Sequence, residues 1–182
     1  MTPRHAHGTE PNWSFRLMAF MYKFRDARLS RQAFLDETGI KQGDTVLDYG
    51  CGPGSYVVKV ARMVGEDGQV YALDRHPLAL KMVAEAARRA HLSNVTTILA
   101  DRDTSLPSDS VDVALLYDIY HDLLEPQLIL QELYRVLKPT GILSSHDHHL
   151  EADALRQAIE SSDLFVLERT DVHTASFSPI VR

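Results

Sequence analysis

Residues 45–56 read Thr45-Val-Leu-Asp48-Tyr-Gly50-Cys-Gly52-Pro-Gly54-Ser-Tyr56. Apolar residues run into an aspartate, glycines then alternate at three positions, and a helical pattern follows. This order is typical of a strand that stops abruptly, a tight turn and the N-terminus of a helix. Glycine allows the tight turn and lets a ligand lie against the backbone. We therefore expect a ligand site at this turn.

Short apolar strands alternate with helices along the rest of the chain. We predict strands over 45–48, 69–74, 94–101, 111–117 and 142–146, helices over 55–64, 77–90, 126–137 and 151–161, and final strands over 164–170 and 173–181. Lys138-Pro-Thr-Gly141 is expected to separate the third of these helices from the fifth strand. Such alternation predicts an α/β fold, a doubly wound and mostly parallel sheet with helices on both faces. The last two strands have no helix between them, so they should form an antiparallel hairpin.

Polar residues stand where the predicted parallel strands end. Ligands in such sheets bind at the carboxyl ends of the strands. The residues at those ends are Asp48, Asp74, Asp101, Tyr117 and His146. We expect them to converge on one site.

Composition limits the function classes. The 182 residues suit one domain, and a net charge of -6 disfavours sequence-independent binding to nucleic acid. No apolar run reaches the roughly 20 residues that span a bilayer. The N-terminus shows no apolar secretory core, so a cytoplasmic protein is expected. The single cysteine, Cys51, excludes an internal disulfide and a site built from several cysteines.

The N-terminal 40 residues differ from the core domain predicted over 41–182. Residues 1–11 have no periodicity and are predicted to be a disordered tail. Residues 12–40 carry apolar side chains at helical spacing among several arginines, which predicts two short basic amphipathic helices. These helices could pack on the domain, cover the site as a lid or dock on a membrane surface. Tyr22 and Arg25 are candidate substrate contacts on them.

The carboxylates distinguish between possible ligands. A dinucleotide site would show G-x-G-x-x-G, whereas the glycines here are spaced G-x-G-x-G. Asp48 would repel a pyrophosphate but suits an ammonium group. Asp74, 20 residues after Gly54, is placed to bind a ribose diol, and Asp101 can accept a hydrogen bond from the adenine amine. Together these groups describe S-adenosylmethionine better than NAD.

Four motifs carry a family resemblance. Val46-Leu-Asp-Tyr-Gly-Cys-Gly-Pro-Gly54, Ala72-Leu-Asp-Arg75, Ala100-Asp-Arg102 and Val136-Leu-Lys-Pro-Thr-Gly141 occur in order. They resemble the successive motifs of class I S-adenosylmethionine-dependent methyltransferases, especially quinone-type and other small-molecule enzymes. The resemblance covers about residues 35–182 and implies a Rossmann-like sheet of order 3-2-1-4-5-7-6 with strand 7 antiparallel.

The resemblance also assigns roles to individual residues. It implies that Asp48 and the backbone of Tyr49, Gly50, Cys51 and Gly52 hold the methionine moiety. Asp74 would bind the ribose and Arg75 would flank the adenine. Asp101 and the Arg102 backbone would read the adenine edge, and the Tyr117 carbonyl would lie near the sulfonium. The product would be S-adenosylhomocysteine. Each acid could instead be a loop-capping aspartate, and Cys51 is expected to pack rather than react.

The acceptor side is less well defined. His121 follows the fourth strand and could act as a general base, or it could only orient its loop. His146-Asp-His-His149 follows the fifth strand, where alternation would put His146 and His148 on one face as substrate contacts. The cluster could instead be structural, or hold a divalent metal as in the catechol-type methyltransferases that the family resemblance includes. Two histidines without a clear third ligand do not define a metal site, so we predict no metal ligand.

Three functions remain open from the sequence. The first is methyl transfer to an unidentified small-molecule acceptor. The alternatives are a nicotinamide-dependent oxidoreductase and a non-catalytic partner subunit that retains the methyltransferase fold. The oligomeric state is not predicted.

Overall fold

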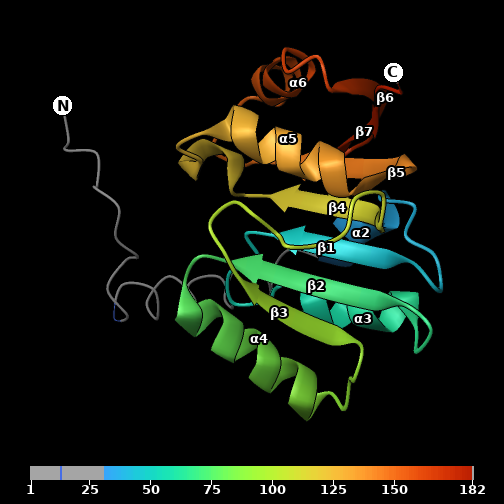
Figure 1. Cartoon of the computed structure of the whole chain (residues 1–182), viewed down its shortest axis with the longest axis vertical. Coiled ribbons are helices and arrows are strands. Elements are labelled where there is room, and N and C mark those ends of the chain that lie inside the picture. The colour runs from blue at the N-terminus through green and yellow to red at the C-terminus, as the bar shows by residue number, and fades with distance from the viewer. Residues whose placement is uncertain (1–12, 14–30, 182) are drawn as a thin grey trace.

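The strands form one seven-stranded sheet in a computed structural model that describes Trp13 and residues 31–181 (Figure 1). The strand order is β3-β2-β1-β4-β5-β7-β6. The strands are β1 (Thr45–Tyr49), β2 (Gln69–Asp74), β3 (Val95–Leu99), β4 (Val111–Tyr117), β5 (Leu137–His146), β6 (Phe165–Thr170) and β7 (Ala175–Pro179). Neighbours from β3 to β5 run parallel, while β7 is antiparallel to both β5 and β6. The predicted α/β fold, strand order and antiparallel seventh strand are confirmed.

Helices cover both faces of the sheet. They are α2 (Arg31–Asp36), α3 (Val57–Val64), α4 (Pro77–Arg89), the 3-10 helix η1 (Tyr120–Asp122), α5 (Pro126–Val136) and α6 (Ala152–Glu160). Buried side chains of α2, α3 and α4 share one core cluster with β1, β2 and β4. Those of α5 and α6 share a second cluster with strands from β1 to β7. Figure 1 shows α4 lying along β2 and β3, and α5 lying along β4 and β5.

The strand register aligns the carboxyl ends of the parallel strands. Asp48 pairs with Ala72 of β2 and with Leu115 of β4, and Tyr117 pairs with His146. Asp101 follows the end of β3 by two residues. The strand ends that carry the predicted site residues therefore lie along one edge of the sheet.

The predicted break over 138–141 is wrong, because β5 begins at Leu137 directly after α5. The register moves from Val111↔Leu137 to Val113↔Ile142, so the extra residues form a bulge in β5. Asp112 holds this bulge by accepting hydrogen bonds from Lys138 Nζ (2.7 Å) and from the Thr45 N–H (2.9 Å). A Cβ on Gly141 would lie 3.0 Å from the Val111 carbonyl oxygen, so the close approach of the two strands favours glycine.

Part of the predicted chain lies outside the described residues. This part comprises the tail 1–11, most of the segment 12–40, and Tyr22 and Arg25. Of the predicted N-terminal helices, α2 is described, and its Phe34 and Leu35 are buried against the sheet. In the portion that the structure describes, no helix is both long enough and apolar enough to span a membrane.

Candidate functional site

The glycine turn after β1 is fastened to the end of β2. Gly50, Gly52 and Gly54 all have positive φ, at 75°, 51° and 86°. The backbone N–H groups of Gly50 and Cys51 both donate to the Leu73 carbonyl oxygen at 2.9 Å. The Gly52 N–H donates to Asp74 Oδ2 at 2.9 Å. Residues that disfavour positive φ would strain this path, which explains why the glycines alternate.

A cavity of about 350 Å³ opens beside this turn, between the strand ends and the start of α5. Six of the ten predicted cofactor residues line it, namely Tyr49, Gly50, Asp74, Arg75, Asp101 and Arg102. The structure therefore brings the adenosine-side candidates together in one cavity. The remaining four, Asp48, Cys51, Gly52 and Tyr117, do not line it.

The apolar wall of the cavity was not predicted. It is made by Leu73, Ala100, Ile119, Leu123, Leu124 and Ile129. Ile119 approaches the turn so closely that a Cβ on Gly50 would lie 2.7 Å from its Cγ1. The sequence signal was weak, because Ile119, Leu123 and Leu124 stand among polar residues between β4 and α5. An apolar wall suits the flat face of an adenine ring.

Asp74 is held by the backbone on both of its oxygens. Oδ1 accepts from the His76 N–H (2.7 Å) and Oδ2 from the Gly52 N–H. Burial raises the pKa of Asp74, and these hydrogen bonds oppose the rise. Each carboxylate oxygen can accept a second hydrogen bond, and the residue faces the cavity. Asp74 is therefore both a cap of the turn before α4 and a possible ligand group.

The adenine-side residues are positioned by Tyr49 and by an ion pair. The Tyr49 hydroxyl donates to the Asp101 carbonyl oxygen at 2.8 Å, which fixes the backbone after β3. Arg102 Nη1 lies 3.2 Å from Glu125 Oε2 in a pair exposed to solvent. Such a pair contributes little to stability, but it joins two segments at the rim of the cavity.

Asp48 is buried on the other face of β1 with one oxygen lacking a partner. Its side chain is enclosed, and Oδ2 has no hydrogen-bond partner within the structure. Burial, reinforced by the Asp74 carboxylate, raises the pKa of Asp48 to about 7. A buried carboxylate of this kind needs a donor or a cation. The residues therefore fit a ligand that brings an ammonium group to the turn.

Tyr117 and Cys51 are packing residues in this structure. The Tyr117 ring lies 5.0 Å from the Tyr56 ring, and its hydroxyl shares a 2.7 Å hydrogen bond with the Ser144 hydroxyl. Cys51 is buried, and burial raises the pKa of its thiol. A buried protonated thiol is a poor nucleophile, in agreement with the expected packing role.

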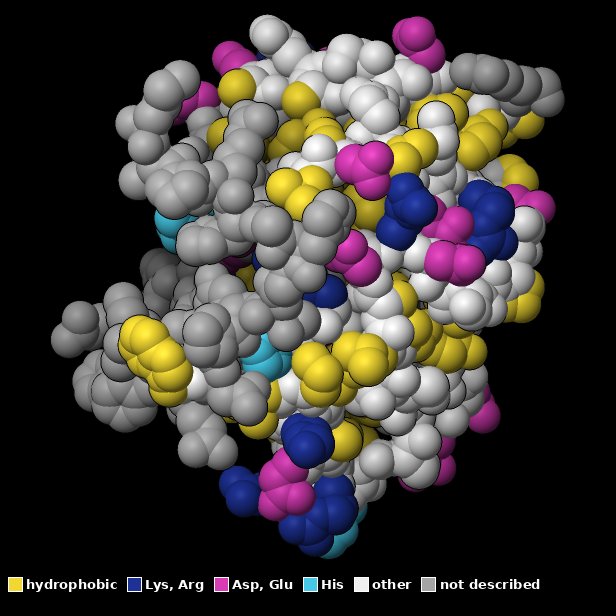
Figure 2. Space-filling model, turned by 60° about the vertical axis from the view of Figure 1, so that its left-hand side comes forward, with side chains coloured by type: hydrophobic (Ala, Val, Ile, Leu, Met, Phe, Trp, Pro, Cys, Tyr) yellow, Lys and Arg dark blue, Asp and Glu magenta, His cyan; other side chains and the backbone are white. Residues whose placement is uncertain are grey.

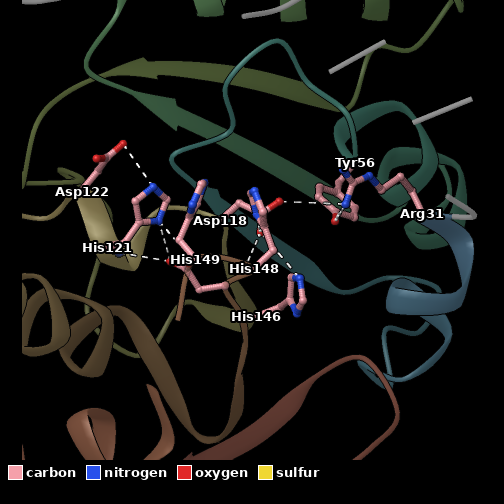
Figure 3. Close-up of polar contacts among 9 residues, drawn as sticks. Arg31, Tyr56, Asp118, His121, Asp122, His146, His148 and His149 are labelled. Carbon is pink, nitrogen blue, oxygen red and sulfur yellow. Dashed lines mark hydrogen bonds and ion pairs between the residues drawn. The ribbon is translucent and has the colours of Figure 1, made fainter. Parts of the chain in front are cut away.

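His121 on η1 is held by a buried carboxylate (Figure 3). Its Nδ1 lies 2.8 Å from Asp147 Oδ2, and its backbone N–H donates to the same oxygen at 3.1 Å. Burial raises the pKa of Asp147, but the hydrogen bonds from His121 and from the His149 N–H outweigh this and hold it below the usual value. An ionised Asp147 keeps the proton on Nδ1 and leaves Nε2 to accept one. Asp147 was not predicted as a site residue.

His146 and His148 meet at Asp118 rather than across a strand face. β5 ends at His146, and the chain turns at 147–149, so the predicted strand alternation is wrong there. His148 Nδ1 nevertheless lies 2.8 Å from Asp118 Oδ1, and His146 Nε2 lies 3.6 Å from the same atom. The His149 ring lies between them and His121, with centroids 3.9 Å from His148 and 4.2 Å from His121. Figure 3 shows all four imidazoles gathered around Asp118 and η1.

Comparison with known proteins identifies the family. Residues 40–174 match the family described as "Methyltransferase domain". The ubiquinone/menaquinone biosynthesis C-methyltransferase UbiE of Escherichia fergusonii is 32% identical over 131 residues, covering 71% of this chain. The chain spans about half of that protein, 52% of its length.

Solved structures agree with the family match. A SAM dependent methyltransferase from Aquifex aeolicus superposes with a TM-score of 0.77 at 28% identity, covering 86% of this chain and 93% of that one. The PH0226 protein from Pyrococcus horikoshii, at 17% identity and a TM-score of 0.66, covers 87% of this chain and 91% of its own, and shares the fold. The chain therefore belongs to the methyltransferase domain family, the class of S-adenosylmethionine-dependent methyltransferases that its four motifs predicted.

Proposed function

We propose that this chain binds S-adenosylmethionine at the glycine turn and transfers its methyl group to a small-molecule acceptor. The observation that carries the proposal is the buried, unpartnered Oδ2 of Asp48 beside a cavity lined by Asp74 and Asp101. An ammonium group would satisfy Asp48, a ribose diol would suit Asp74, and an adenine would suit the apolar wall. A nicotinamide dinucleotide fits less well, because Asp48 would repel its pyrophosphate.

Two groups of residues would hold the two parts of the cofactor. Asp48 and the backbone of Tyr49, Gly50, Cys51 and Gly52 would hold the methionine moiety. Asp74, Arg75, Asp101 and Arg102 would hold the adenosine, and the Tyr117 backbone carbonyl would lie near the sulfonium. When bound, S-adenosylmethionine supplies a methyl group activated on its sulfonium. The protein then has to align the acceptor and exclude water.

His121 would remove the acceptor proton. Asp147 orients its imidazole through Nδ1, and Nε2, 3.6 Å from Asp122 Oδ2, is the atom that would accept the proton. Ile119, just before η1, and Asp122, the last residue of η1, both line the cavity, so a ligand bound there would lie near His121. The acceptor would therefore be a small molecule that carries a removable proton, such as a hydroxyl group or an activated carbon. His146, His148, Tyr22 and Arg25 stay candidate acceptor contacts.

Surface charge supports a small acceptor rather than a polyanion. The net charge is -6, and acidic, basic and hydrophobic side chains are interspersed on the described surface in Figure 2. Nucleic-acid binding would require a basic surface. A cytoplasmic location remains part of this proposal.

The proposal is tested by calorimetry followed by a turnover assay. S-adenosylmethionine and S-adenosylhomocysteine are expected to bind and NAD is not; binding of NAD alone would contradict the proposal. With a panel of phenols and quinols, release of S-adenosylhomocysteine is then measured. His121→Asn should lower the rate about 10²–10⁴-fold without changing cofactor affinity, while His91→Asn, a remote exposed substitution, should not. Cofactor binding without turnover for any acceptor would favour the non-catalytic subunit.

A further inference from the structure

Two carboxylates and an imidazole converge from separate segments beyond the cofactor cavity. Asp118 follows β4, whereas Asp147 and His148 follow β5. One ligand atom from each of these three residues lies within 4.8 Å of the others. In the portion of the chain that the structure describes, they form a group with the spacing of metal ligands. Figure 3 shows Asp118 and His148 facing one another from the two strand ends.

Burial makes this cluster different from an acidic surface patch. The side chains of Asp147 and Asp118 are 0% and 8% exposed, while that of His148 is 42% exposed. Two enclosed carboxylates whose oxygens lie within 4.8 Å of each other repel, so a cation between them would be stabilised electrostatically. The cluster therefore reaches solvent through its imidazole.

Neighbouring groups restrain both carboxylates of this cluster. Asp147 accepts hydrogen bonds from the His121 ring and from the backbone N–H groups of His121 and His149. Arg31, 4.0 Å from Asp118 Oδ2, restrains the other carboxylate from the opposite side. Ligating carboxylates are usually hydrogen-bonded in this way by outer residues. His146 Nε2, 3.6 Å from Asp118 Oδ1, is a fourth donor within reach.

We propose that Asp118, Asp147 and His148 form a binding site for one divalent transition-metal ion at the mouth of β4 and β5. Mixed carboxylate and imidazole ligands suit Mn²⁺ or Zn²⁺, whereas Mg²⁺ prefers oxygen ligands and water. This assignment replaces the prediction of no metal ligand, which considered only the histidines. The sequence did not reveal the two carboxylates as ligands, because Asp118 lies 30 residues before His148. Asp147 turns inward only because the chain leaves the strand after His146. The site does not depend on the proposed methyl transfer.

The test is calorimetry of the full chain with Zn²⁺, Mn²⁺ and Mg²⁺, without cofactor. One Zn²⁺ or Mn²⁺ per chain is expected to bind, and more tightly than Mg²⁺. His148→Asn should weaken binding at least about tenfold, and circular dichroism should show the fold intact because the side chain is partly exposed. No binding of Zn²⁺ or Mn²⁺, or preferential binding of Mg²⁺, overturns the proposal.

Two control variants exclude other histidines. His91→Asn removes an exposed imidazole two residues after the end of α4, and its positive φ of 55° suits asparagine. A double variant, His5→Asn with His7→Asn, removes the imidazoles of the N-terminal stretch. Both should bind the ion as the unmodified chain does; equal affinity in His148→Asn, or loss in either control, overturns the proposal. Cofactor affinity measured on the same samples separates failure of the metal site from failure of the proposed methyl transfer.

Discussion

At the scale of single residues, the buried carboxylate of Asp48 makes the stability of the fold depend on pH. Its carboxylate is enclosed, and one oxygen lacks a partner. Its pKa of about 7 exceeds that of an unfolded aspartate, so the folded chain binds a proton that the unfolded chain releases. Stability therefore falls as pH rises from the unfolded pKa near 4 to the folded value near 7. A bound ammonium group would reverse this effect.

We predict that Asp48→Asn makes the ligand-free protein more stable at pH 8. Removing a buried, ionised carboxylate should raise the free energy of unfolding by roughly 1–3 kcal/mol, measured by urea denaturation, with a much smaller gain at pH 4. The same variant should bind S-adenosylmethionine more weakly. In the unmodified chain, affinity should rise between pH 6 and pH 8 as Asp48 ionises. A pH-independent affinity would show that Asp48 does not meet the ammonium group.

At the scale of elements, the three glycines of the turn serve different purposes. A Cβ on Gly50 would meet the Ile119 side chain, and one on Gly54 would lie 2.9 Å from Val83 Cγ2 of α4. A Cβ on Gly52 would meet nothing within 4 Å. Gly50 thus lets the cavity wall close on the turn, and Gly54 lets α4 approach it. Gly52 needs glycine only for its positive φ.

We predict that Gly50→Ala destabilises the fold more than Gly39→Ala. Both glycines have φ of 75°, but a Cβ on Gly39 meets nothing within 4 Å. Gly39→Ala should cost about 1–2 kcal/mol from the left-handed backbone alone, and Gly50→Ala about 1–3 kcal/mol more from overpacking against Ile119. Urea denaturation measures both. Equal losses would mean that Ile119 moves aside freely.

The elements that sequence reasoning predicted well are those with local signals. Strand ends, helix starts and the glycine turn depend on neighbouring residues, and the helix predicted from residue 77 does begin at Pro77. The bulge in β5 was missed because its stability comes from Asp112, 26 residues away from Lys138. The Asp147–His121 pair was missed for the same reason, since it joins residues 26 apart. Contacts between segments have no local pattern.

At the scale of the whole molecule, Glu37 ties the segment after α2 to the turn between β6 and β7. Its Oε2 accepts from the Thr174 N–H (2.9 Å), the Thr174 hydroxyl (3.0 Å) and the His173 N–H (3.1 Å). Arg169 also donates to the Glu37 carbonyl oxygen. Phe34 stacks on the His173 ring with centroids 4.6 Å apart. Contacts between segments more than 130 residues apart in sequence therefore hold α2 against the turn between β6 and β7. Phe34 also packs against His146 at the end of β5.

We predict that Glu37→Ala lowers the free energy of unfolding by about 2–4 kcal/mol, because it leaves the two backbone N–H groups and the Thr174 hydroxyl without an acceptor. Glu37→Gln, which keeps one oxygen, should lose less. Glu66→Ala, in the exposed loop before β2, is the control and should change stability by under about 0.5 kcal/mol. Urea denaturation with a constant m-value measures all three. If Glu37→Ala matched Glu66→Ala, the two ends of the domain would be held together by the Phe34–His173 contact, and Phe34→Ala should then cause the larger loss.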